Sequence, residues 1–179
     1  MHPRLIELLD HADGARHELL AVVTTLTPAR YGARPSTGAW SVAEQLAHLY
    51  LVEHSSVRAM FRAFKNARQS GLGPETETGS LIGALDHTGL KDGLHKREAP
   101  TFVQPAEIVD LESALGRLEE SRESLRAWAR EADGFALATV RWPHPALGEL
   151  NLYEWVVMIA DHELRHLAQI RDALTHVDE

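Results

Sequence analysis

The chain of 179 residues has no cysteine and no long apolar run. Without cysteine it has no disulfides, no thiolate metal sites and no cysteine nucleophiles, which is typical of a protein from a reducing compartment. No apolar run reaches the roughly 18 residues needed to cross a bilayer, and the first residues lack the apolar core of a secretory signal. We therefore expect a cytoplasmic protein with no membrane partner.

Basic residues are also scarce. The chain has 18 Lys and Arg against 26 Asp and Glu, which gives a net charge of -8. A nucleic-acid-binding surface normally needs a basic stripe, so we expect no nucleic-acid partner. Hydrophobic residues make up 44% of the chain, enough to build a core, and the length is that of one domain. We expect residues 1–179 to form a single domain.

Helical periodicity dominates the sequence and predicts four long helices. A Ser41-x-x-Glu44 capping box begins the second, and Asn151 with Glu154 begins the fourth in the same way. The predicted ranges are Pro3 to Leu26, Ser41 to about Ser70, Pro105 to about Asp133, and Asn151 to about Leu174. The pattern indicates an all-α four-helix bundle. Residues 71–104 hold six of the 12 glycines and are interpreted as a long crossover loop.

Histidine is the residue type present in excess, with 11 copies. Two of them, His162 and His166, lie one turn apart on the fourth predicted helix. They share a stripe with apolar residues that marks a core-facing side, namely Trp155, Ile159 and Ile170. Side chains spaced i, i+4 on one helix face can bind a single metal ion. The alternative is one histidine that fills the core and one at its rim.

A third histidine on another helix strengthens the metal interpretation. His48 lies about 10 Å along the second predicted helix, inside the bundle. His54 competes for the role, but it points about 120° away and is better explained as a surface residue. We interpret the other histidines as bystanders: His2, His11, His17, His87, His95, His144 and His176.

Three imidazoles with an open fourth position are typical of catalytic zinc sites. Nickel and ferrous iron also accept imidazole, so the pattern leaves the divalent metal open. Asp161 and Glu163 flank the first histidine of the fourth helix and are weak candidates for a catalytic base. Both point about 100° from the ligand face, and the alternative is a solvated charge.

His162 to His166 also matches the H-E-x-x-H motif of zinc proteases. The extended protease motif requires a glycine and then a third histidine, where this chain has Gln169 and Asp172. No convincing sheet precedes the helix, and little chain follows it. We therefore reject the protease interpretation.

Two segments resemble a known family. Trp40 to Leu49 resembles the W-S-x-x-E-x-x-x-H-L segment of the DinB/YfiT-like superfamily, and His162 to Ile170 resembles its closing H-x-x-x-H-x-x-Q-I helix. The resemblance implies a four-helix bundle, often a homodimer, with one divalent metal held by three histidines. Transferred by motif, these are His48, His162 and His166. Related proteins include mycothiol-dependent maleylpyruvate isomerase and bacillithiol S-transferases, which implies a low-molecular-weight thiol as a cofactor.

The expected function is that of a DinB-like metal-binding protein with an open three-histidine site acting on a small-molecule substrate. A metal-bound hydroxide would give a hydrolase, and a metal-bound thiolate would give a thiol transferase or isomerase. The alternative is a non-catalytic bundle that a metal stabilises or that binds a small molecule.

Overall fold

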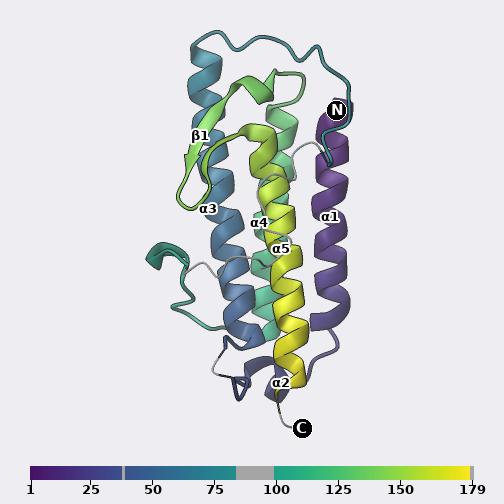
Figure 1. The fold of residues 1–179 in the computed structure, drawn as a ribbon, viewed down its shortest axis with the longest axis vertical. Helices are drawn as coiled ribbons and strands as arrows, with labels where there is room; N and C mark the ends of the chain where they lie inside the picture. The colour runs from purple at the N-terminus through teal and green to yellow at the C-terminus, as the bar shows by residue number, and fades with distance from the viewer. Residues whose placement is uncertain (38, 84–98, 178–179) are drawn as a thin grey trace.

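The computed structural model of the chain describes residues 1–37, 39–83 and 99–177. Four long helices run along the molecule, with short elements at their ends (Figure 1). In chain order the elements are α1 (Pro3–Val23), α2 (Pro28–Gly32), α3 (Val42–Gln69), η1 (Thr101–Val103), α4 (Leu111–Glu131), η2 (Leu137–Thr139), β1 (Arg141–His144), β2 (Gly148–Asn151) and α5 (Leu152–Thr175). None of the helices within these ranges is long and apolar enough to cross a membrane.

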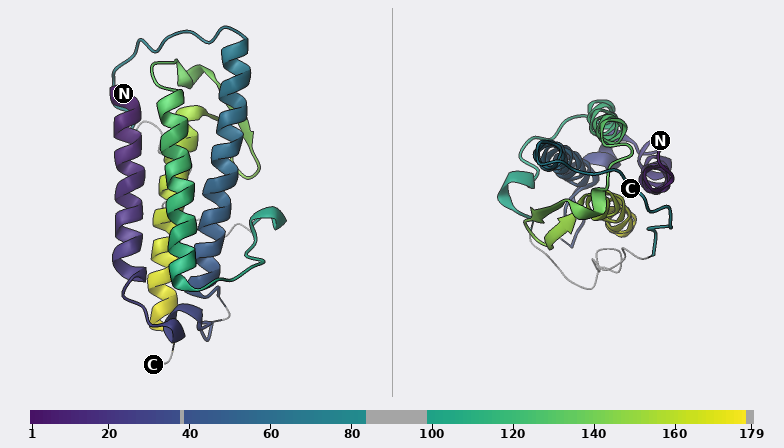
Figure 2. Two further views of the ribbon diagram at one scale, coloured as in Figure 1. Left: turned by 180° about the vertical axis from the view of Figure 1, so that it is seen from behind. Right: turned by 90° about the horizontal axis from the view of Figure 1, so that it is seen from above.

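The helices do not alternate in direction. In Figures 1 and 2, α1 and α5 run one way along the bundle while α3 and α4 both run the other way. The connection from α3 to α4 must therefore return along the whole bundle, as the predicted crossover requires. Residues 84–98 of that connection lie outside the described residues. The all-α four-helix bundle with a long crossover is confirmed.

Both predicted capping boxes are present, and each begins a helix that carries histidines of the site. At α3, the Glu44 amide donates to Ser41 Oγ over 3.2 Å and the Ser41 amide donates to Glu44 Oε2 over 2.9 Å. At α5, the Glu154 amide donates to Asn151 Oδ1 over 2.9 Å, and the Asn151 amide donates back. These bonds satisfy amides that the first turn of a helix leaves without a partner.

The predicted ends of two helices were wrong. The third long helix begins at Leu111 rather than Pro105, because Asp110 is its N-cap and accepts from the Ser113 amide over 2.9 Å. The preceding residues form η1 and an extended segment. The first helix ends at Val23 rather than Leu26, and the short α2 begins after the cap residue Thr27.

The chain before α5 folds back over the bundle. Strand β1 pairs with β2 in an antiparallel hairpin whose register places Arg141 opposite Asn151. The hairpin lies beside one end of α3 and α5 (Figure 1).

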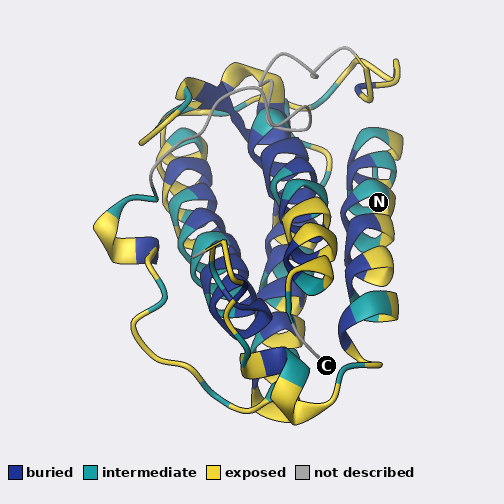
Figure 3. Cartoon of the chain, turned by 60° about the horizontal axis from the view of Figure 1, so that its bottom comes forward, coloured by how far each residue is buried: buried dark blue, intermediate teal, exposed yellow. Residues whose placement is uncertain are grey.

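The long helices turn their buried faces toward one another (Figure 3). A polar layer divides the buried core in two. One apolar cluster contains Phe64, Trp128 and Tyr153, and the other contains Leu46 and Leu118. Between them every long helix contributes a buried polar residue, namely Arg16, Glu53, Ser121, Arg122 and Glu163. The histidines that the sequence singled out lie at or next to this layer.

Candidate metal centre

The structure brings His48 of α3 together with His162 and His166 of α5. The Nε2 atoms of His48 and His162 are 3.2 Å apart. One ligand atom from each of the three histidines lies within 4.8 Å of the others. The imidazole centroids are 4.5 Å apart between His162 and His166 and 4.8 Å apart between His48 and His166. Three imidazoles from two helices therefore converge on one point.

The spacing between His48 and His162 fits a common ion. Two nitrogens that each bind a tetrahedral ion at about 2.0–2.1 Å lie about 3.3 Å apart. The observed 3.2 Å between His48 Nε2 and His162 Nε2 matches this value. The three side chains, which are nitrogen donors of borderline softness, suit zinc, nickel or ferrous iron.

Burial keeps these imidazoles neutral. Removal from water lowers the pKa of His48, although a hydrogen bond to the Val103 carbonyl partly opposes the effect. Burial, followed by the nearby His48, lowers the pKa of His162 to about 3. The pKa of His166 is held well below its usual value by burial and by the two other imidazoles. At neutral pH the site therefore offers lone pairs rather than positive charge.

The backbone of the crossover contributes a contact that the sequence did not reveal. His48 Nδ1 lies 2.7 Å from the Val103 carbonyl oxygen, which accepts only. Nδ1 therefore donates, and His48 Nε2 is left as the bare nitrogen that points toward His162. The acceptor is a backbone carbonyl, which every residue type has, so no sequence motif signals the contact.

The two acidic candidates are occupied by partners away from the histidines. Asp161 is buried, and its Oδ1 is 3.0 Å from His11 Nε2 of α1. Glu163 is also buried and pairs with the guanidinium groups of Arg16 and Arg122. A role for either carboxylate as a base stays a prediction to which these contacts add no support. The Glu163 pairs agree with the rejection of the protease motif.

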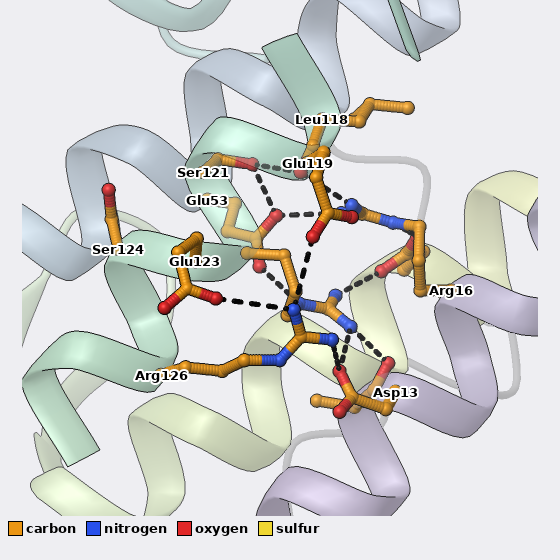
Figure 4. A network of polar contacts seen from close by, with 12 residues as sticks. Asp13, Arg16, Glu53, Leu118, Glu119, Ser121, Glu123, Ser124 and Arg126 are labelled. Atoms are coloured by element: carbon orange, nitrogen blue, oxygen red, sulfur yellow. Dashed lines mark hydrogen bonds and ion pairs between the residues drawn. The ribbon is translucent and has the colours of Figure 1, made fainter. Parts of the chain in front are cut away.

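Glu163 belongs to a buried ionic cluster, which we define as Arg16, Glu53, Arg122 and Glu163. Arg122 donates to Glu53 and to Glu163 over 2.7 Å each, and Arg16 donates to Glu53 over 2.7 Å. Figure 4 shows Arg16 and Glu53 from α1 and α3 meeting beside Ser121 of α4, whose hydroxyl donates to Glu53 over 2.6 Å. Burial alone raises the pKa of Glu53, but Arg122 and Arg16 outweigh it and hold the pKa below its ordinary value.

Other histidines lie outside the group of His48, His162 and His166, which we call the histidine triad. His54 packs against Tyr50 with ring centroids 5.5 Å apart and is not a member of the three-histidine group. His144 of β1, read from the sequence as a bystander, lies 5.0 Å from the Trp155 ring and near enough to help lower the pKa of His162. The hairpin brings it there from 18 positions upstream of His162, which no local pattern reveals. His87 and His95 lie outside the described residues.

The fold and the histidine group together define a class: four-helix bundles whose facing helices present a cluster of side chains suited to a metal ion. A family model described as the DinB superfamily matches residues 11–170. The chain belongs to the DinB superfamily, as its two motifs predicted.

The chain is similar to one protein in sequence and to one solved structure in fold. The uncharacterized protein YuaE of Bacillus subtilis (strain 168) is 28% identical over 166 residues, which cover 88% of this chain and 91% of YuaE. The crystal structure of TT2238, a four-helix bundle protein, matches with a TM-score of 0.65 at 24% identity, covering 94% of this chain and 98% of that one. The structural match supports the fold.

Proposed function

We propose that the protein binds one divalent metal ion through His48, His162 and His166 and uses it to act on a small-molecule substrate. The observation that supports the proposal is the convergence of three imidazole ligand atoms within 4.8 Å of one another. Buried imidazoles with lowered pKa values are costly to keep without a partner, and an ion satisfies their lone pairs. Zinc, nickel and ferrous iron all suit this donor set.

The chemistry of this proposal depends on an open coordination position. Three protein ligands leave the fourth position of the metal free. Zinc would lower the pKa of a water molecule in that position to about 7, or would stabilise a thiolate there. The residues of this chain hold three neutral nitrogens in place and exclude water from two of them, since His48 and His166 are 4% and 6% exposed. The family resemblance favours a thiol transferase or isomerase, with a hydrolase as the second reaction type.

Removal of a ligand tests the metal site directly. We expect His162→Ala to weaken zinc binding by more than about 100-fold, which exceeds the effect of losing an outer hydrogen-bond partner. His54→Ala is the matched control, because His54 is a partly buried histidine of α3 outside the triad. Calorimetric titration of metal-free protein measures both affinities. Equal affinities for the two variants, or no zinc bound by the wild type, would contradict the proposal.

A non-catalytic role is the second candidate, and one observation favours it. The three histidines come from two helices, so a bound ion would cross-link α3 to α5 at the polar layer. Metal-dependent thermal stability without turnover of thiol conjugates or hydrolysable esters would support this role. Turnover that is lost in His162→Ala would support the enzyme.

The remaining expectations also belong to the proposal. The family resemblance implies a homodimer, and light scattering that shows a monomer would remove this part. The absence of cysteine is consistent with a cytoplasmic location.

A further inference from the structure

Gln45 has a buried side chain beside the histidine triad. It lies on α3, one turn before His48, and is 2% exposed. Its Oε1 atom lies 3.3 Å from Nδ1 of His166 on α5, and its Nε2 atom lies 3.4 Å from the backbone carbonyl of Trp40. The amide therefore bridges the segment before α3 and a histidine of the triad.

The partner of each Gln45 atom determines which way round the amide sits. The Trp40 carbonyl only accepts, so the NH₂ group of Gln45 must face it. The amide oxygen then faces His166. Because this oxygen can only accept a hydrogen bond, its partner nitrogen must be the donor. Nδ1 of His166 must therefore carry the ring proton, and Nε2 is left bare.

The same arrangement occurs at a second histidine of the triad. Nδ1 of His48 donates to the Val103 carbonyl, which leaves His48 Nε2 bare and facing His162. Two acceptors of different origin, one a side chain of α3 and one the backbone of η1, therefore select the same tautomer in two of the three imidazoles. In metal sites, such outer acceptors orient the ligand ring and raise its basicity.

We propose that Gln45 is a positioning residue of the metal centre, whose amide oxygen holds His166 in the Nδ1–H tautomer and so presents Nε2 as the ligand atom. The inference rests on the proposed metal function for its purpose. The tautomer itself is a property of the metal-free protein and can be measured without any metal.

The first experiment measures the tautomer. Long-range ¹H–¹⁵N correlation spectra of metal-free protein distinguish protonated from bare ring nitrogens. We expect the wild type to show a protonated Nδ1 and a bare Nε2 at His166. Gln45→Met removes the acceptor at similar volume and should give a mixture of tautomers, whereas Gln45→Glu keeps the acceptor and should retain the wild-type form. A bare Nδ1 in the wild type, or an unchanged tautomer in Gln45→Met, would overturn the proposal.

The second experiment measures zinc affinity by calorimetric titration. Gln45→Met should bind zinc about 10–100-fold more weakly, the usual effect of losing an outer partner of a ligand. Gln45→Glu should bind at least as tightly as the wild type, because a carboxylate is a stronger acceptor. Both variants lose the donor to Trp40, so their difference isolates the acceptor facing His166.

The control and the possible outcomes separate the two proposals. Gln69→Met makes the same substitution at an exposed position of the same helix and should leave zinc affinity unchanged. Gln45→Glu binding as weakly as Gln45→Met would assign Gln45 a packing role and overturn the inference. A wild type that binds no zinc would defeat the proposed function, while the tautomer spectra would still decide the role of Gln45.

Discussion

The polar layer of the bundle contains two buried clusters of opposite design. The ionic cluster combines two guanidinium groups with two carboxylates, so its charges cancel and its atoms hydrogen-bond to one another. Among the described residues, no carboxylate forms an ion pair with the histidine triad. Its imidazoles are held neutral by burial, and two Nε2 atoms face each other at 3.2 Å. One cluster is complete within the chain, and the other presents lone pairs toward a common point.

The difference suits the ionic cluster to a structural role and the histidine triad to the proposed metal binding. The ionic cluster joins all four long helices. A buried ion pair that loses one partner leaves an uncompensated charge, so removal of one member should cost stability. Three imidazoles that converge without a carboxylate stabilise one another little. A bound metal ion would stabilise the group more, because it would satisfy their lone pairs. The clusters share α3 and α5, so the ionic cluster also supports the relative placement of the helices that carry the histidines.

The largest expected effect comes from a substitution that breaks the ionic cluster. Arg122 is fully buried and pairs with Glu53 and Glu163. Arg122→Met should lower the free energy of unfolding by about 3–5 kcal/mol, because two buried carboxylates lose a partner. Denaturant unfolding measures the change. Arg130→Met on the same helix, where Arg130 is 58% exposed, should change it by less than about 0.5 kcal/mol. A loss as small as the control would show that the cluster does not support the fold.

The next largest effect comes from zinc binding to the histidine triad, which distinguishes the triad from the ionic cluster. Zinc at 100 times its dissociation constant should raise the free energy of unfolding by about 2.7 kcal/mol, since it binds the folded chain. Arg130→Met should gain the same amount, and His162→Ala should gain none. Thermal unfolding with and without zinc provides the measurement. An equal gain in His162→Ala would place zinc elsewhere on the protein.

The smallest effect concerns how the free energy of unfolding of the metal-free protein depends on pH, which differs between the two clusters. Burial lowers the pKa of His162 to about 3 in the folded chain, so the unfolded chain binds protons first as pH falls below about 6.5. Stability should therefore drop by about 2 kcal/mol between pH 7 and pH 5 from His162 alone. Glu53, whose pKa is also lowered, loses its contribution only below about pH 4.5, where the unfolded carboxylate becomes protonated.

The comparison variant for this titration is His162→Gln, which removes the imidazole. Its free energy of unfolding should fall less between pH 7 and pH 5 than that of the wild type, measured by denaturant unfolding at both pH values. Parallel curves for the two proteins would mean that His162 is not held in its neutral form.

Much of the architecture followed from local signals. The capping boxes at Ser41 and Asn151 predicted the starts of α3 and α5, because their bonds form within four residues. The start of α4 was missed by six residues: proline at 105 suits a first turn, but Asp110 provides the side-chain cap. The glycine-rich stretch of residues 71–104 predicted the crossover. The placement of the hairpin depends on its packing against α3 and α5, which local propensity does not record.

The sequence by itself determined the helices, the shared face of His162 and His166, and the inclusion of His48, because helical geometry converts spacing into direction. Only the tertiary structure decided that Glu163 meets Arg16 and Arg122, that Gln45 reaches His166, and that the Val103 carbonyl accepts from His48. These contacts join residues between 41 and 147 positions apart. Their pairing depends on how the four helices pack, and no periodicity along one helix encodes that arrangement.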